Sequence, residues 1–156
     1  MFKSMRNKKR EVSREVVDVI LQRGEYGILS TIGEHGYPCI TPLSYVYMNN
    51  CIYFHCAEEG EKLDNIRRNG KVAFSVVNDT KIIPEKFTTD FKSVVIYGEA
   101  KEIDGEAKKE ALRGIVKKYS PDFIEAGERY IEKSSHVTKI VEIKIDHVTG
   151  KVIERQ

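Results

Sequence analysis

Two tight-turn signals constrain the fold of this chain most strongly, because they divide one stretch into strands that double back. Gly33–Gly36 follows the β-rich run Tyr26–Ile32, and Asn49–Asn50 lies between Tyr37–Met48 and Cys51–Cys56. Asparagine tolerates the positive φ angles that a two-residue hairpin turn requires. Both turns predict antiparallel hairpins, whose strands need no crossover helix between them.

The rest of the chain predicts three further strands and several short helices. The strands are expected at Lys71–Asn78, Ser93–Ile103 and Lys139–Asp146. Helices are expected where apolar residues recur at helical spacing, from Ser13 to about Arg23, from Gly60 to Asn69, from Asp104 onward, and from Ser120 to about Lys133. About six strands without regular strand–helix–strand alternation predict a mainly β fold, an antiparallel β-barrel with flanking helices.

Charge is distributed unevenly along the 156 residues. The net charge is +2, but the first ten residues hold five basic groups and no acid, so the remainder carries 21 basic and 24 acidic residues. A nucleic-acid-binding domain would spread positive charge over one face, so no nucleic-acid partner is expected. We interpret residues 1–12 as a solvated basic tail and 13–156 as one domain.

Location is indicated by what the sequence lacks. No apolar run reaches the roughly 18 residues of a membrane span, and the charged N-terminus has no apolar segment typical of a secretory signal. The three cysteines, Cys39, Cys51 and Cys56, are an odd and sparse set, which fits free thiols in a reducing compartment. We therefore expect a cytoplasmic protein with no membrane partner.

The densest group of chemically useful side chains is Tyr53–Asn65. A predicted strand delivers His55 to its end, a glycine permits a turn, and Lys62 lies in the first turn of the next helix. A helix N-terminus with a lysine suits a phosphate group, and an imidazole could position a ring. On spacing alone, a surface lysine and a packing histidine explain the same pattern at least as well.

Two other candidate sites lie near this segment. Thr41–Tyr45 contains Pro42, which interrupts a strand ladder and could leave backbone groups available to a ligand, although an edge strand protected from aggregation would look the same. His35, Cys39, Cys51, His55 and Cys56 lack any C-x-x-C pair or zinc-like spacing, so no metal site is expected. Dinucleotide-binding, P-loop, hydrolase and metalloprotease motifs are absent from the sequence.

The order of several short motifs resembles one known group of proteins. They are Gly27–Thr31, Gly36–Pro38, Thr41–Tyr45, Ile52–His55, Gly60–Asn65, Asn69–Val72, Lys86–Thr89 and Ser93–Gly98. Together they resemble the pyridoxamine 5′-phosphate oxidase-like FMN-binding split barrels, and most closely the branch related to nitroimidazole resistance. The resemblance runs from about Arg14 to Lys151.

This resemblance implies a six-stranded antiparallel split barrel that forms a homodimer with FMN at the interface. It places the strand residues Thr41, Pro42, Leu43 and Ser44 beside the flavin, His55 and its neighbour Cys56 near the ring, and Lys62 on the phosphate. Asn65 and, from across the site, Ser93 complete the expected cofactor-binding set.

Two departures from the relatives qualify the expected activity. Ser134–Ser135–His136 stands where relatives often place a large aromatic residue, and Thr41 occupies a position that resembles an arginine of the true oxidases. Oxidation of pyridoxamine phosphate is therefore not expected.

The resemblance favours an FMN-dependent oxidoreductase. A reduced nicotinamide, NADH or NADPH, would deliver hydride to FMN, and a small acceptor such as a nitro compound or a quinone would receive it, with His55 as the candidate catalytic residue. Two alternatives remain open at this point. One is a flavin-binding or sensing module without catalysis, and the other is a haem-binding barrel with His55 as axial ligand.

Overall fold

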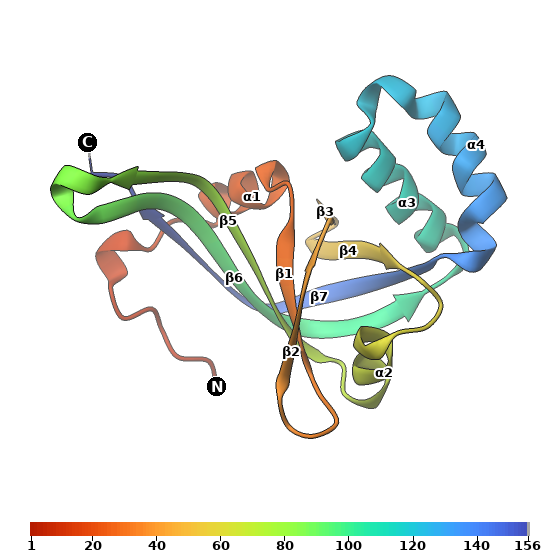
Figure 1. The fold of residues 1–156 in the computed structure, drawn as a ribbon, viewed down its shortest axis with the longest axis horizontal. Coiled ribbons are helices and arrows are strands. Elements are labelled where there is room, and N and C mark those ends of the chain that lie inside the picture. The colour runs from red at the N-terminus through yellow and green to blue at the C-terminus, as the bar shows by residue number, and fades with distance from the viewer. Residues whose placement is uncertain (156) are drawn as a thin grey trace.

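The computed structural model describes residues 1–155, which form one antiparallel sheet and four α-helices (Figure 1). The helices are α1 (Arg14–Arg23), α2 (Glu61–Arg68), α3 (Gly105–Tyr119) and α4 (Ile124–Ser134), with short 3-10 turns at Lys8–Arg10, Pro84–Lys86, Pro121–Phe123 and Ser135–Val137. The strands are β1 (Gly27–Ile32), β2 (Pro38–Leu43), β3 (Val46–Met48), β4 (Cys51–Cys56), β5 (Lys71–Ile83), β6 (Thr88–Ile103) and β7 (Lys139–Ile153).

The sheet corrects the expectation of a closed six-stranded barrel. Seven strands pair in the order β2-β1-β5-β6-β7-β4-β3, so β2 and β3 are its two edges and the sheet stays open in the described chain. The additional strand arises because the predicted run Tyr37–Met48 is broken at Tyr45. There the backbone N–H donates to the Tyr119 hydroxyl at 3.0 Å and the carbonyl accepts from Lys118 at 2.9 Å, so α3 occupies groups that a continuous strand would need.

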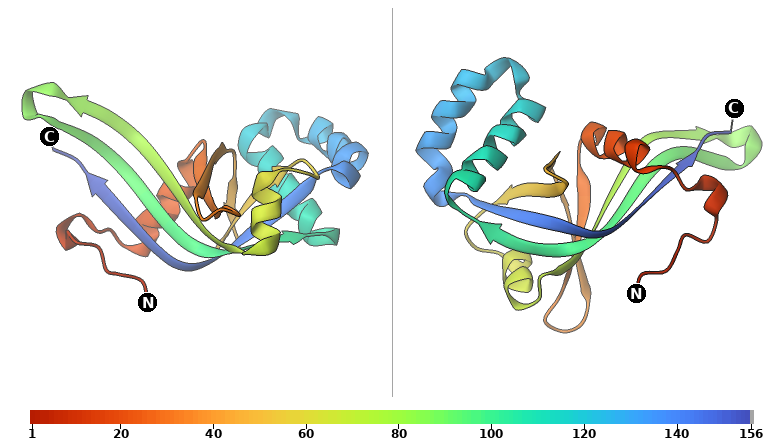
Figure 2. Two further views of the ribbon diagram at one scale, coloured as in Figure 1. Left: turned by 60° about the horizontal axis from the view of Figure 1, so that its bottom comes forward. Right: turned by 180° about the vertical axis from the view of Figure 1, so that it is seen from behind.

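Three strands are longer than expected. β5 continues to Ile83 and β6 begins at Thr88, so most of the segment between the two expected strands Lys71–Asn78 and Ser93–Ile103 becomes paired strand. β7 continues past its predicted end to Ile153. Figure 2 shows these three strands bending together into an arm that extends away from α3 and α4.

The predicted turns and helix starts are confirmed. Asn49 and Asn50 have φ of 53° and 57°, as a two-residue hairpin turn requires. Ser13 precedes α1, although its side chain makes no capping hydrogen bond, and Gly24 follows the last residue of the helix. The Asp104 carboxylate accepts a hydrogen bond from Gly105 N–H at 2.9 Å and so caps α3.

Two apolar clusters pack on the two faces of the sheet. The larger one contains Val17, Ile20 and Leu21 of α1 with fully buried Phe54 and Phe74. The smaller one joins α3 to β3, β4 and β7 through Val46, Tyr53, Ala111 and Ile140. Because alternate residues of a strand face opposite sides, β4 contributes to both clusters.

The first twelve residues contact the sheet at both of their ends. Val12 N–H donates to the Gly150 carbonyl at 3.1 Å, and the Phe2 ring stacks on those of Tyr97 and His147 with centroids 5.1 and 4.9 Å apart. Among the described residues, no helix is long and apolar enough to cross a membrane.

Candidate functional site

The start of α2 has the features of an anion-binding site, and the local sequence explains why they are present. Gly60 has a φ of 145°, which favours glycine, and no side chain caps the helix, so the first backbone N–H groups have no capping partner. Lys62 lies in this first turn, half-buried, and makes no ion pair or hydrogen bond within residues 1–155. The positive end of the helix and the lysine together favour a bound anion.

The acidic residues of the same turn have partners elsewhere. The Glu61 carboxylate accepts a hydrogen bond from the Cys39 thiol at 3.4 Å, and the Asp64 carboxylate lies 3.9 Å from the Arg67 guanidinium. The contact of Glu61 with Cys39 also places the start of α2 beside β2. Strand β2 and the Lys62 turn therefore belong to one region of the surface.

The predicted flavin strand is an edge strand. Thr41 and Leu43 are half-buried and pair with Leu29 and Gly27 of β1, whereas Pro42 and Ser44 are exposed. The other side of β2 has no partner strand in the described chain. The unpaired edge of β2 leaves backbone groups without a strand partner in the described chain, and Pro42 stays in register with Ile28 of β1.

His55 and Cys56 lie on opposite faces of β4. Cys56 is in the larger apolar cluster, and burial raises the pKa of its thiol although the nearby Lys62 charge opposes this shift. His55 is exposed and faces the α3–α4 hairpin instead. The structure thus separates two residues that the sequence analysis assigned to one cofactor site.

Asn65 has a structural role in this chain. Its side chain is 1% exposed, donates to the Thr31 hydroxyl at 3.0 Å and accepts from the Arg68 guanidinium at 3.0 Å. All these partners belong to the protein, so Asn65 ties α2 to β1 beneath the Lys62 turn.

Ser93 lies on a different part of the sheet from Lys62. It pairs with Val77 and Lys151 in the extended arm. The end of α2 lies beside Ala100, whose N–H donates to the Gly70 carbonyl at 2.7 Å. Ser93 therefore lies seven residues, or about 20 Å along β6, from the position beside the end of α2.

The α3–α4 hairpin forms a cavity beside His55 that the sequence analysis did not identify. This space, which we call the hairpin cavity, has a volume of about 120 Å³ and is lined by His55, by apolar side chains of both helices and by Ser134, Ser135 and Thr138. The helical spacing of Leu112, Ile115 and Val116 indicates an apolar face on α3. It does not predict a cavity, because a cavity depends on how α3 and α4 pack together.

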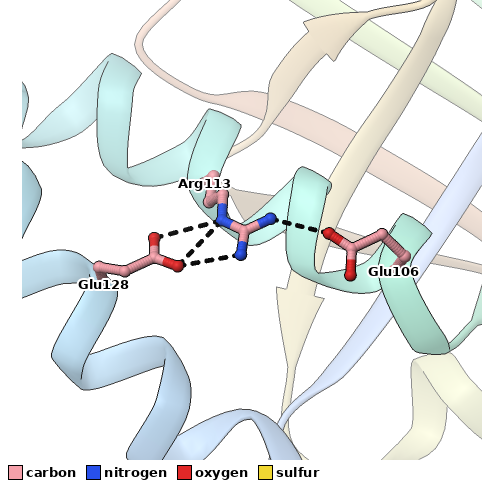
Figure 3. Close-up of polar contacts among 3 residues, drawn as sticks. All are labelled: Glu106, Arg113 and Glu128. Atoms are coloured by element: carbon pink, nitrogen blue, oxygen red, sulfur yellow. Dashed lines mark hydrogen bonds and ion pairs between the residues drawn. The ribbon is translucent and has the colours of Figure 1, made fainter.

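An ion-pair network braces this hairpin (Figure 3). The Arg113 guanidinium contacts both carboxylate oxygens of Glu128 at 3.0 to 3.2 Å and one oxygen of Glu106 at 2.9 Å. The hydrogen bond from Arg113 lowers the pKa of Glu128. Both groups are on the surface, so the network orients α4 on α3 more than it stabilises the fold.

Within residues 1–155, no three His, Cys, Asp or Glu side chains gather as a metal ion would require. The cysteines are free, and Cys39 and Cys51 are half-buried. The region around Lys62 and β2 combines a positive helix start with an unpaired strand edge.

The family of the chain follows from a sequence comparison. A model of the family described as pyridoxamine 5′-phosphate oxidase matches residues 13–152. The chain belongs to the pyridoxamine 5′-phosphate oxidase family. The match includes Lys62, β2 and His55, which confirms the resemblance noted from the motifs. No curated protein matches the sequence significantly.

Solved structures share the fold of this family member at low identity. A candidate 5-nitroimidazole antibiotic resistance protein from Bacteroides thetaiotaomicron is 21% identical with a TM-score of 0.74, over 91% of this chain and 86% of that one. A conserved hypothetical protein from Mycobacterium tuberculosis is 16% identical with a TM-score of 0.84, over 98% and 96%. A flavocytochrome from Azotobacter vinelandii is 22% identical with a TM-score of 0.82, over 97% and 73%.

Proposed function

We propose that this chain is an FMN-binding flavoprotein that acts as an oxidoreductase on a small acceptor. The observation that carries the proposal is the unpaired Lys62 ammonium at an uncapped helix start, beside the open edge of β2. The similarity to a flavocytochrome supports a flavin as the ligand.

The phosphate of FMN fits the Lys62 turn. Lys62 would supply a positive charge, and the first N–H groups of α2 would supply hydrogen-bond donors. Both contributions favour a dianion such as the phosphate. The donor set suits a phosphate better than a neutral ligand, because a neutral ligand would leave the half-buried ammonium without a partner.

The isoalloxazine ring would lie along β2. Thr41 and Ser44 offer hydroxyl groups there, and the unpaired edge of the strand offers backbone donors and acceptors. Bound FMN would supply two-electron chemistry, since it can accept hydride from a reduced nicotinamide and reduce a nitro compound or a quinone. The acceptor would have to contact the ring for this transfer, and His55 is the candidate residue that would hydrogen-bond it.

A homodimer would complete the site. Ser93 lies in the extended arm formed by β5, β6 and β7, and the arm of a partner chain would bring its own Ser93 to the flavin. The tip of this arm exposes Ile82 at 70% and Phe87 at 97%, and Phe87 also has a left-handed φ of 49°. A bulky apolar residue that is both exposed and in this conformation fits a contact with a second chain.

The haem alternative has less support from the geometry. His55 is accessible as an axial ligand, but the cavity beside it is about 120 Å³, below the roughly 300 Å³ of ordinary cofactor pockets. A porphyrin would require the α3–α4 hairpin to move away. A flavin-binding module without turnover is a different outcome of the experiment below.

The test is reconstitution of the purified full chain with FMN, followed by visible spectra before and after NADH or NADPH is added in the absence of oxygen, and again after a nitro compound is added. We expect a flavin spectrum that bleaches with the nicotinamide and recovers with the acceptor. Bound FMN that neither nicotinamide reduces, and that passes no electrons to the nitro compound after reduction with dithionite, would indicate a binding module. A Soret band with haem, or no uptake of FMN at all, would overturn the proposal.

A further inference from the structure

We propose that residues 1–10 form a docking surface for a membrane that carries anionic lipid headgroups. The inference does not depend on the proposed function, because it concerns a segment that the candidate flavin site does not use. The sequence analysis interpreted residues 1–12 as a solvated tail, whereas the structure holds both ends of this segment against the sheet.

The segment carries a concentrated and unpaired positive charge. Its cations are Lys3, Arg6, Lys8, Lys9 and Arg10, and it contains no acid. All of them except Arg10 are exposed, and the ion pairs within residues 1–155 all lie outside the segment. Cations without a protein partner remain available to anionic groups, and each contributes about fivefold in affinity near an anionic lipid surface.

Contacts at both ends hold this charge in place. At one end the Phe2 ring stacks on the rings of Tyr97 and His147. At the other end residues 11–12 pair with β7. A segment that is already ordered loses less conformational freedom when it binds, so its charge contributes more to the affinity.

A single turn gathers three of the cations. The Asn7 side chain accepts a hydrogen bond from Lys9 N–H at 3.2 Å and so begins the 3-10 turn Lys8–Arg10. Figure 1 shows this turn on the side of the molecule away from α3 and α4. A flat surface can therefore approach the turn without contact with that hairpin.

Apolar side chains accompany the charge. Met1 is fully exposed, and Phe2 and Tyr97 keep 46% and 42% of their surface exposed. Aromatic rings and basic residues on one segment are typical of membrane-surface binding. One kind of contact alone gives only marginal membrane affinity, and this segment supplies both charge and apolar area.

The charge of the remaining chain favours a membrane over a nucleic acid. Residues 11–156 carry 21 basic and 24 acidic residues, so a nucleic acid that extended past the segment would meet a negative body. A membrane contacts only the face that lies on it. The hollow beside Phe2 is lined by Glu99, Asp146 and Lys71, and these two acids and one base offset only one of the five cations.

The binding test is co-sedimentation of the full chain with lipid vesicles. One preparation is phosphatidylcholine alone, and the other contains about 30% phosphatidylglycerol. We expect binding to the anionic vesicles to be at least about tenfold stronger in about 0.1 M salt. This preference should shrink in about 0.5 M salt, because salt screens exposed charges.

A pair of triple variants tests the charge. Lys3→Gln, Lys8→Gln and Lys9→Gln together should weaken binding to the anionic vesicles at least about tenfold and leave binding to phosphatidylcholine unchanged. The matched control makes the same change in net charge at three exposed lysines of α3 and α4. Its substitutions are Lys109→Gln, Lys117→Gln and Lys133→Gln, and it should bind as the unmodified chain does.

A second pair tests the apolar contact. Phe2→Ala should weaken binding about tenfold at both salt concentrations, because salt does not screen the burial of a ring. Phe123→Ala removes another exposed phenylalanine, at 66% exposure, and should change nothing.

Other results would overturn the inference. These are absence of binding, equal binding to the two kinds of vesicle, or equal losses in the two triple variants, which would reflect net charge alone. A single-stranded RNA oligonucleotide is titrated in parallel. If the RNA binds more tightly than the anionic vesicles, and Lys3→Gln, Lys8→Gln and Lys9→Gln together abolish this binding, the segment is a nucleic-acid site instead.

Discussion

The Lys118 ammonium lies 3.7 Å from the centre of the Tyr45 ring and donates a hydrogen bond to the Tyr45 carbonyl at 2.9 Å. Tyr45 is fully buried, and its hydroxyl donates to the Leu21 carbonyl. The two residues thus join the end of α3 to the break between β2 and β3, beside the candidate flavin strand. Burial lowers the pKa of Lys118 to about 8.

Lys118 should make stability depend on pH in a defined direction. Its pKa is about 8 in the folded chain and near 10.5 when unfolded, so the unfolded chain binds more protons between these values. Its contribution to the free energy of unfolding is therefore lowest below pH 8 and rises as the pH increases toward 10.5. Lys118→Met, which keeps the apolar stem, should abolish this rise.

The measurement is urea unfolding of both proteins at intervals from pH 7 to 10. The difference between them, unmodified minus variant, should increase with pH above 8, because the tyrosines and cysteines titrate in both proteins and cancel. A difference that stays constant over this range would contradict the assignment.

Lys62→Ala should weaken FMN binding much more than riboflavin binding. Only FMN carries the phosphate, and loss of a charged hydrogen bond corresponds to about tenfold or more in affinity. Fluorescence titration with both flavins gives the two dissociation constants. Lys109→Ala, an exposed lysine on α3, is the control and should change neither value. Equal losses for both flavins would show that Lys62 does not bind the phosphate.

Asn65→Ala should destabilise the fold by about 1 to 3 kcal/mol, because it leaves the buried Thr31 hydroxyl without its partner. Thr31→Val should cost less, and the double variant should cost less than the two single changes added together. Urea unfolding measures all three. If Asn65 instead contacts FMN, the main effect would be on flavin affinity, with stability of the flavin-free chain unchanged.

Phe87→Asp should weaken self-association. Asp tolerates the left-handed backbone at this position better than Phe, so the change removes the exposed apolar ring without adding strain. The loss of a buried Phe corresponds to about tenfold or more in the dissociation constant. Sedimentation should give about twice 17.9 kDa for the unmodified chain and a shift toward 17.9 kDa for the variant.

A matched variant separates this effect from a general change in charge. Phe123→Asp replaces another exposed phenylalanine, at 66% exposure, near the start of α4. It should leave the sedimentation unchanged. An unmodified chain that sediments as a monomer in the presence of FMN would reject the dimer altogether.

Features that depend on neighbouring residues were predictable. The Asn49–Asn50 turn and the Asp104 cap were recognised correctly, because a positive φ or a helix cap is decided by one or two side chains. Strand alternation also requires adjacent residues such as His55 and Cys56 to face opposite sides, although the family resemblance places both near the ring. The alternation could not indicate which face of β4 packs in the larger apolar cluster and which face contacts α3.

The sequence by itself determined the family, most of the strands and the Lys62 turn, since these depend on motif order, local pattern and turn chemistry. Only the tertiary structure decided that β2 and β3 separate, because the groups responsible, on Lys118 and Tyr119, lie over 70 residues away in the chain. The hairpin cavity beside His55 likewise depends on contacts between residues far apart in the chain. Its size depends on how far α4 packs from α3, and that spacing results from many side chains together.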